Sequence, residues 1–300
     1  MRIALATCTS LPDWEVDDQP LHEALQQHGV EVEHPVWNDK SIDWSSFDAC
    51  VIRTTWDYTD QRDEFVQWAR MAASHTCLYN PAATIEWNTC KSYLKDLAEC
   101  GIATIPTCWL EAGSSPDLAE LMMAQGWTRG FLKPRIGATA RGTCRFNIED
   151  HSLEEAMSHL DTMLSSEHMM LQPYLDSVES LGEWSAIVID EELTHAVRKI
   201  PRPGDYRVQD DFGATDETHT PTPDELAMVH ETIKVLHAHP EWTGHGQAPL
   251  LYARLDYLKM DGRSLLNEVE LVEPSLFFRH APDSAVAFAR AIVSRCRAQS

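Results

Sequence analysis

The chain has 300 residues and a mass of 33.9 kDa, which is enough to bury a substantial core in one large domain or in two to three packed lobes. With 43% hydrophobic and 24% charged residues, its composition is that of an ordinary globular protein and excludes collagenous, disulfide-scaffold and low-complexity classes. A formal net charge of -23 repels nucleic acid and anionic membranes, so we expect neither as a partner, although the acidity by itself also serves solubility.

The eight cysteines show no C-x-x-C spacing, so the sequence predicts reduced, mostly buried thiols rather than a zinc site or a disulfide framework. The chain begins on an apolar strand without the pattern of a secretory signal. No apolar run approaches the ~20 residues of a membrane-spanning helix. These features favour a cytoplasmic protein.

Strand and helix patterns alternate over the first third of the chain. The expected elements, in order, are a strand over residues 3–8, a helix over 18–28, a strand over 30–37, a strand over 49–54 and a helix over 60–74. Such a βαβ order predicts a parallel sheet with helices on its faces, so we expect an α/β lobe over residues 1–86.

Strands dominate the remainder, after a helix over residues 88–100 and an extended segment over 105–110. Strands are expected over 130–134, 143–148, 169–173, 184–190, 193–199, 249–258 and 264–272, and helices over 151–166, 222–238 and 282–297. This order predicts an α+β arrangement added to the first lobe. Two or three lobes commonly enclose a ligand cleft between them.

A glycine-ended loop lies between two of these strands. Gly137 and Gly142 have the spacing of a Walker loop, but Thr143 stands where that motif needs lysine and a strand follows, so a true P-loop is excluded. Lys133 precedes the loop and Arg141 lies in it. The loop either folds over polyphosphate with its backbone N–H groups or is a plain hairpin turn.

Acidic side chains lie on two predicted strands near the C-terminus. Glu268 and Glu270 alternate along one strand and therefore share a face, and Asp256 lies on the neighbouring strand. These three carboxylates form an all-oxygen set suited to Mg²⁺, with Arg254 pointing the same way. The alternative is a solvated sheet face in which the same groups form ion pairs.

Polar residues at 172, 174 and 183 lie where two lobes would meet. Gln172 and Tyr174 have groups that can meet a purine edge, and Glu183 can accept from ribose hydroxyls, although each is also compatible with a structural role. The 14 histidines are scattered and no G-x-S-x-G segment occurs, so histidine-metal and serine hydrolases are poorly supported. A dinucleotide oxidoreductase is disfavoured because residues 3–10 lack a Gly-x-Gly turn.

In this order the motifs resemble those of the ATP-grasp ligases, the superfamily of glutathione synthetase and D-alanine–D-alanine ligase. The resemblance implies an ATP-grasp fold, with an N-terminal substrate lobe over 1–86, a central lid lobe over 87–172 and a C-terminal antiparallel-sheet lobe over 173–300. It implies ATP and Mg²⁺ as cofactors, with Asp256, Glu268 and Glu270 as metal ligands, the third of which is commonly Asn in the family. The nucleotide-binding residues that it implies are Lys91, Lys133, Gly137, Ala138, Thr139, Ala140, Arg141, Gly142, Gln172, Tyr174, Leu175 and Glu183.

Several segments, at residues 52–58, 195–199, 204–209 and 268–277, resemble the O-ureido-D-serine cyclo-ligases, the D-cycloserine-forming branch of this superfamily. This resemblance implies activation of a carboxylate as an acyl phosphate and attack by a nitrogen of the same molecule. An amide ligase for another amino acid, or a nucleotide-binding sensor without ligase activity, remain as alternatives. The relatives are often dimers, so a homodimer is expected by analogy.

Cationic side chains outside the nucleotide motifs are the candidates for catalysis. Charge in a phosphoryl-transfer transition state calls for fixed cations more than for a base, and we assign that role to Arg254, Arg207 and Lys199. The candidates for contact with the small-molecule substrate are Arg53, Arg202 and Ser275. For Arg53 a helix-end or turn contact is an equal alternative.

Overall fold

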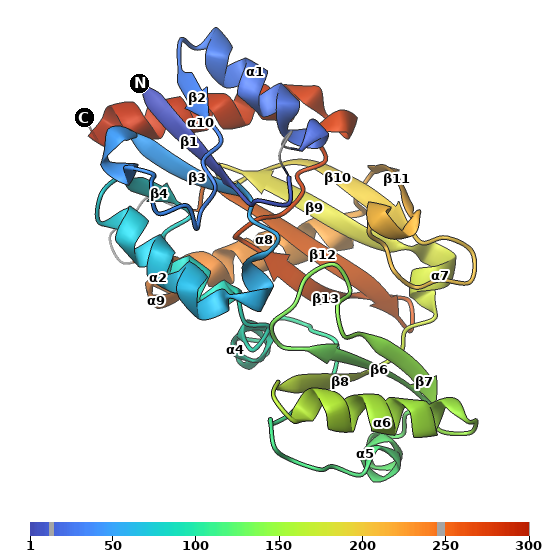
Figure 1. The fold of residues 1–300 in the computed structure, drawn as a ribbon. Helices are drawn as coiled ribbons and strands as arrows, with labels where there is room; N and C mark the ends of the chain where they lie inside the picture. The colour runs from blue at the N-terminus through green and yellow to red at the C-terminus, as the bar shows by residue number, and fades with distance from the viewer. Residues whose placement is uncertain (12–14, 245–249, 300) are drawn as a thin grey trace.

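The fold, taken from a computed structural model, is described for residues 1–11, 15–244 and 250–299 and contains three β-sheets (Figure 1). The N-terminal sheet is parallel, with strand order β2-β1-β3-β4. Its elements are β1 (Arg2–Thr7), α1 (Gln19–Gln27), β2 (Glu31–Glu33), β3 (Ala49–Thr54), α2 (Arg62–Ala73) and β4 (Cys77–Tyr79). The predicted βαβ order is therefore present, although the second strand is much shorter than the expected 30–37.

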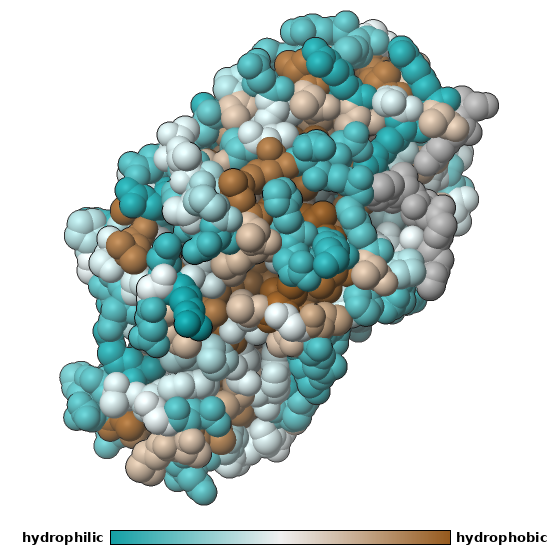
Figure 2. Space-filling view, turned by 180° about the vertical axis from the view of Figure 1, so that it is seen from behind, coloured by the Kyte–Doolittle hydropathy of each residue, from teal (hydrophilic) through white to brown (hydrophobic). Residues whose placement is uncertain are grey.

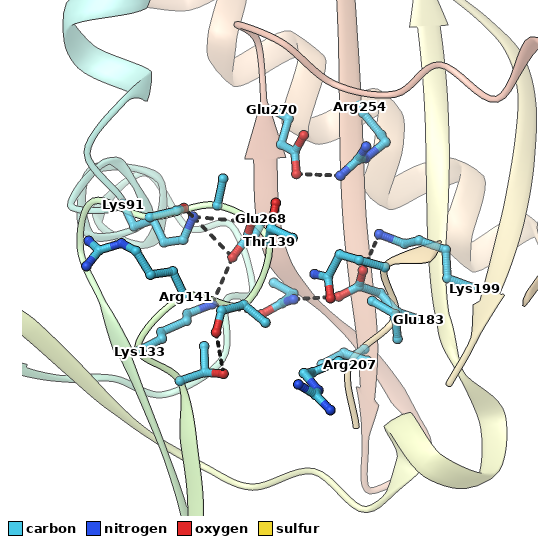
Figure 3. Close-up of a pocket in the computed structure, with 18 of the residues that line it drawn as sticks. Lys91, Lys133, Thr139, Arg141, Glu183, Lys199, Arg207, Arg254, Glu268 and Glu270 are labelled. Atoms are coloured by element: carbon cyan, nitrogen blue, oxygen red, sulfur yellow. Dashed lines mark hydrogen bonds and ion pairs between the residues drawn. The ribbon is translucent and has the colours of Figure 1, made fainter. Parts of the chain in front are cut away.

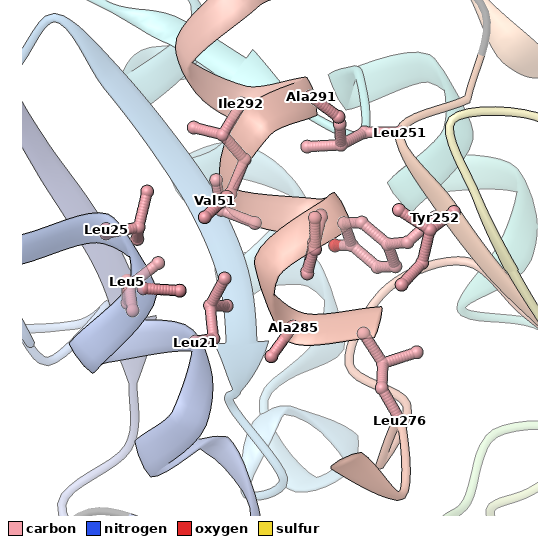
Figure 4. Close-up of a cluster of buried hydrophobic side chains, with 14 of the residues drawn as sticks. Leu5, Leu21, Leu25, Val51, Leu251, Tyr252, Leu276, Ala285, Ala291 and Ile292 are labelled. Carbon is pink, nitrogen blue, oxygen red and sulfur yellow. The ribbon is translucent and has the colours of Figure 1, made fainter. Parts of the chain in front are cut away.

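Alternation along β1 explains how this sheet is covered on both faces. Ile3 and Leu5 belong to a core shared with α1 and with the C-terminal helix α10 (Pro282–Gln299), whereas Ala4 and Ala6 pack in a second core with α2. Figure 4 shows Leu5 and Ile292 in the first of these cores. The last helix of the chain thus completes the core of its first lobe.

The lid lobe is an antiparallel sheet of order β5-β8-β6-β7. Its elements are β5 (Cys108–Leu110), α5 (Leu118–Gln125), β6 (Arg129–Pro134), β7 (Cys144–Asn147), α6 (Ser152–Leu164) and β8 (Met169–Pro173). Leu132 and Leu171 pack with α5 and α6, and the period of two places Lys133 and Gln172 on the opposite face. That opposite face lines a cavity.

The expected single helix over residues 88–100 is wrong. The structure has two helices, α3 (Ala82–Asn88) and α4 (Tyr93–Glu99), separated by a short break. The break has a tertiary cause: the Asn88 amide donates to the Val269 carbonyl at 2.8 Å and accepts from the Leu271 N–H at 2.8 Å. It places Lys91 outside both helices. Tyr93 and Leu97 of α4 belong to a core formed mostly by the C-terminal lobe, to which Met170 of the lid sheet also contributes.

The C-terminal lobe contains a five-stranded antiparallel sheet of order β11-β10-β9-β12-β13. Its elements are α7 (Ser177–Leu181), β9 (Glu183–Ile189), β10 (Glu192–Ile200), β11 (Thr215–His219), α8 (Pro223–Ala238), α9 (Pro240–Thr243), β12 (Tyr252–Met260) and β13 (Arg263–Glu270). The edge strand β11 was not expected from the sequence. The strand expected over 249–258 begins at a residue outside the described ranges, and its later part is β12.

The surface seen from behind in Figure 2 is largely hydrophilic at both ends, and hydrophobic residues gather in the middle of that face. Among the residues described, no helix has the length and apolar character needed to cross a bilayer. The arrangement as a whole is the predicted one, with a parallel sheet followed by two antiparallel sheets (Figure 1).

Candidate active site

A cavity of about 440 Å³ is lined by residues from all three lobes. The N-terminal lobe supplies Trp56 and Tyr58, the lid supplies Lys133 and the 137–141 loop, and the C-terminal lobe supplies side chains of β9, β12 and β13. Figure 3 shows its charged groups, which come from segments far apart in the sequence. Those sequence-predicted residues that line the cavity are Lys91, Lys133, Gly137, Ala138, Thr139, Ala140, Arg141, Gln172, Tyr174, Leu175, Glu183, Lys199, Arg207, Arg254, Glu268, Glu270 and Ser275.

Two lysines converge on one carboxylate in this cavity (Figure 3). Lys133 Nζ lies 3.2 Å from Glu268, and Lys91 Nζ lies 3.4 Å from the same carboxyl group and 3.0 Å from the Gly137 carbonyl. Burial lowers the pKa of Lys133 more than Glu268 restores it, whereas at Lys91 the carboxylates outweigh burial and raise the pKa. Both cations face the cavity, and the charge of Lys133 is compensated less fully than that of Lys91.

The loop over 137–142 covers the cavity from the lid side. Thr139 and Ala140 have positive φ angles of 48° and 54°, and the Arg141 guanidinium, 2.7 Å from Glu167, ties the loop back to the lid. Gly142 has φ 67° and lies behind the loop, where an added Cβ would meet the Met163 side chain at 2.8 Å. The loop thus has a defined backbone conformation and lines the cavity with its small residues.

The three predicted metal ligands lie on adjacent strands. Asp256 on β12 is the register partner of Glu268 on β13, and Arg254 is the partner of Glu270. Burial raises the pKa of Glu268, but the charges of Lys91 and Lys133 outweigh it and lower that pKa to about 2. Burial also raises the pKa of Glu270, here to about 7, because nearby carboxylates reinforce it against the Arg254 charge.

The carboxylates are held by cations in this structure. Asp256 does not line the cavity: it contacts Arg254 at 3.0 Å and Lys199 at 3.1 Å, and accepts from the Ser185 hydroxyl at 2.6 Å. In the described ranges no three Asp, Glu, His or Cys side chains are gathered into a ready set of metal ligands. The chemistry still fits Mg²⁺, because the donors are all carboxylate oxygens.

Aromatic rings surround the predicted nucleotide-base residues. Phe131 and Tyr206 have ring centroids 5.4 Å apart, and Tyr174 lies 6.2 Å from Tyr206. Gln172 is buried and donates to Thr107 at 2.9 Å. The sequence interpretation missed Phe131 and Tyr206, although alternation with Lys133 on β6 puts Phe131 on the cavity face.

Glu183 lies deeper, at the start of β9. It forms an ion pair with Lys199 and accepts a hydrogen bond of 2.6 Å from the Asn267 amide, whose oxygen accepts from Lys133 at 3.2 Å. Asn267 thus links the lid lysine to Glu183, a role that its place beside Glu268 in the sequence did not reveal. Arg207 is held by Asp205, with its Nη2 2.6 Å from that carboxylate.

Two of the predicted substrate residues are corrected by the structure. Arg53 is 1% exposed, pairs with Asp18 at 2.9 Å and donates to the Pro274 carbonyl, so the structural alternative holds. Arg202 is exposed and does not line the cavity. Gly142 also does not line it. Ser275 does, and its hydroxyl donates to Asp17 at 3.2 Å.

Comparison with known families gives two matches that divide the chain. Residues 3–80 match the family described as D-cycloserine synthetase DcsG, N-terminal domain, and residues 114–240 match that described as prokaryotic glutathione synthetase, ATP-grasp domain. The second match covers β6, β7 and β8 of the lid sheet and much of the C-terminal lobe.

Full-length relatives are similar over nearly the whole chain. The cycloserine biosynthesis protein DcsG of Streptomyces lavendulae is 30% identical over 311 aligned residues, 98% of this chain and 99% of that protein. The crystal structure of D-cycloserine synthetase DcsG matches with a TM-score of 0.88 and 28% identity, over 99% of this chain and 100% of that one.

The fold also extends to more distant enzymes. The D-alanine–D-alanine ligase of Bacillus anthracis, in a structure with ATP, matches with a TM-score of 0.68 at 17% identity, over 99% of this chain and 97% of that one. At that identity the match supports the ATP-grasp fold alone. Together with the full-length relative, these matches show that the chain belongs to the DcsG family of ATP-grasp proteins and is an ATP-dependent ligase.

Proposed function

We propose that this ligase closes the ring of O-ureido-D-serine to give D-cycloserine, with release of CO₂, NH₃, ADP and phosphate. The observation that carries the proposal is the 30% identity, over 98% of the chain, to a protein named for cycloserine biosynthesis. The charged cavity agrees with it, because an amino-acid carboxylate and nucleotide phosphates both need cations at one place.

The nucleotide is held by groups that already face the cavity. Lys91 and Lys133 would neutralise phosphate oxygens, and the 137–141 loop would cover them with backbone N–H groups. The purine would lie among the rings near Gln172 and Tyr174, with Glu183 toward the ribose.

Glu268 and Glu270, with Asp256 beneath them, are the residues that would hold Mg²⁺. When bound, the ion would supply positive charge to the phosphates and replace some of the present ion pairs with Arg254 and the lysines. Asn267 and Ser185 stay in place to orient the neighbouring carboxylates.

Phosphoryl transfer depends on position and charge. A carboxylate oxygen of the substrate attacks the γ-phosphorus as the bond to the ADP oxygen breaks, and Arg254, Arg207 and Lys199 stabilise the charge that develops. The lid loop excludes water, which would hydrolyse the acyl phosphate.

Ring closure then forms the C–N bond. The nitrogen attached to the side-chain oxygen attacks the activated carboxyl carbon, phosphate leaves with the C–O electron pair, and the nitrogen loses its proton. Addition of water to the carbamoyl group finally releases it as CO₂ and NH₃, so that substrate, ATP and water balance the five products.

The test is ADP release measured over a panel of amino acids that includes both O-ureidoserine enantiomers, with the product identified by mass. We expect stimulation by the D-enantiomer and a product of the mass of cycloserine. Turnover with a different amino acid would instead indicate another amide ligase. ATP binding without turnover under any amino acid would indicate a nucleotide sensor and overturn the proposal.

A further inference from the structure

A glutamate just beyond β13 has a place in the cavity that the nucleotide and metal roles leave unused. Glu273 lines the cavity wall together with Trp56 and Tyr58, three residues after Glu270. The other inner glutamates of the described wall have cationic partners: Glu183 has Lys199 and Glu268 has Lys91. No ion pair joins Glu273 to a cation in the ranges that the structure describes.

The backbone around Glu273 is held in place by three side chains. Its own carbonyl accepts from the Trp56 indole at 3.0 Å, and the next two carbonyls, of Pro274 and Ser275, accept from Arg53 at 2.9 Å and Arg254 at 3.2 Å. Three consecutive carbonyls are thus fixed by donors from two lobes. The buried Arg53 therefore has a structural role here.

The side chain is oriented as well. Tyr58, itself 6% exposed and stacked on Phe65 with ring centroids 4.9 Å apart, hydrogen-bonds the Glu273 carboxyl. Burial and the nearby Glu270 charge raise the pKa of Glu273 to about 8. The carboxyl group is therefore preorganised, and the charges of Lys91 and Arg254 offset only part of the rise in its pKa.

The cavity wall therefore carries groups of both charges. Positive charge that suits an anion comes from Lys91, Lys133 and Arg254. Another part of the wall, formed by Trp56, Tyr58 and Glu273, has a carboxyl group beside aromatic rings. An α-amino acid has the matching polarity, because a single carbon separates its carboxylate from its ammonium group. Carboxylates and aromatic faces are the groups that recognise an ammonium.

We propose that Glu273, held by Tyr58, is the acceptor for the α-ammonium group of the substrate, so that the carboxylate of the same molecule points toward Arg254. This assignment rests on the proposed use of an amino-acid substrate. It gives the ligase a specificity-determining residue for α-amino acids, separate from the residues that hold ATP.

The test compares Glu273→Gln with the parent protein. The amide keeps the size of the side chain and a hydrogen bond to Tyr58 but removes the negative charge. We expect the KM for the amino-acid substrate to rise about tenfold to a hundredfold, while the KM for ATP stays within about twofold. Glu64→Gln, an exposed glutamate on α2 that does not line the cavity, makes the same chemical change and is the matched control; its KM values stay within about twofold.

Two inhibitors separate ammonium recognition from other roles. D-Serine retains the ammonium and carboxylate, and 3-(ureidooxy)propanoate retains the ureido and carboxylate groups but has no amine. We expect Glu273→Gln to weaken inhibition by D-serine about tenfold and to leave inhibition by the propanoate unchanged. Equal weakening of both, or of the propanoate alone, overturns the proposal, and an unchanged KM for the amino acid does so as well.

Failure of the proposed reaction is recognised separately. If the parent protein releases no ADP with O-ureido-D-serine but does so with another amino acid, the same comparison is made with that amino acid and its deaminated counterpart. Thermal unfolding of Glu273→Gln, expected within about 2 °C of the parent, distinguishes a loss of recognition from a loss of folding.

Discussion

Lys133 carries its ammonium group at a position that is only 4% exposed. Its partners, Glu268 and Asn267, lie on a strand that is more than 130 residues away in the chain. Removing the ammonium leaves the lid without the cation that faces the cavity from β6. We therefore expect Lys133→Ala to weaken ATP binding by at least about tenfold, measured as the Kd of the nucleotide by calorimetry.

The exposed Lys95 on α4 offers a control with the same loss of charge. Lys95→Ala leaves the Kd for ATP within about twofold of the parent value. An unaltered Kd in Lys133→Ala would show that this lysine only balances Glu268.

Glu268 receives both lysines and is a predicted metal ligand. We expect Glu268→Gln to lower kcat by at least about 100-fold, because the amide supplies neither the charge nor the ligand. The loss of two ion pairs costs about 1–3 kcal/mol of unfolding free energy, measured by urea titration. Turnover at the parental rate would contradict the role of this residue in the reaction.

Among the elements, α8 has the most complete N-terminal cap. Thr222 accepts from the Glu225 N–H, while the Glu225 carboxylate accepts from the Thr222 N–H at 3.0 Å and pairs with Lys259 at 3.1 Å. Burial raises the pKa of Glu225, but these partners and His219 outweigh it and lower the pKa from 4.5 to about 2. A carboxyl group whose pKa is lowered by folding stabilises the fold above pH 4.5, and that contribution is lost as the pH falls toward 2.

Glu225→Gln tests this linkage. We expect the variant to lose about 1–2 kcal/mol of unfolding free energy at pH 7, and the difference from the parent to shrink as the pH is lowered from 5 to 2.5. Denaturant unfolding at several pH values measures it. Glu154→Gln, in the exposed first turn of α6, changes stability by no more than about 0.5 kcal/mol, and a pH-independent difference at Glu225 would refute the expectation.

The elements also show which features of the fold sequence patterns predict and which they do not. Alternation along β13 predicted that Glu268 and Glu270 share a face, because a period of two is set by the strand itself. The break between α3 and α4 was missed because its cause, the Asn88 amide on Val269, lies 181 residues away. The edge strand β11 is polar on both faces and has no hydrophobic pattern to detect.

The same distinction applies to the candidate site. Lys91 and Lys133 were identified by their resemblance to family motifs, and Glu268 and Glu270 by their alternation along a strand; both can be seen in the sequence alone. Arg53 pairs with Asp18, 35 residues away in the chain. Glu273 is positioned by Trp56 and Tyr58 of another lobe. No local sequence pattern encodes such contacts. Sequence reasoning thus named candidate nucleotide and metal residues of the cavity and missed Glu273.

At the scale of the molecule, the net charge of -23 is a long-range property that single contacts do not remove. Like charges oppose the compact state, and salt screens them over a Debye length of ~8 Å at physiological ionic strength. We expect the melting temperature to rise by about 2 °C or more between 20 and 300 mM sodium chloride, measured by calorimetry. A falling melting temperature would mean that the observed ion pairs contribute more than the net repulsion opposes.

The packing of α10 against α1 and β1 has a consequence for synthesis on the ribosome. A nascent chain emerges with its N-terminal end first, yet the core that β1 shares with α1 lacks α10 until residues Pro282–Gln299 have been translated. A transcript truncated before α10 would yield a polypeptide that contains every strand of the N-terminal sheet but lacks the helix that completes its hydrophobic core.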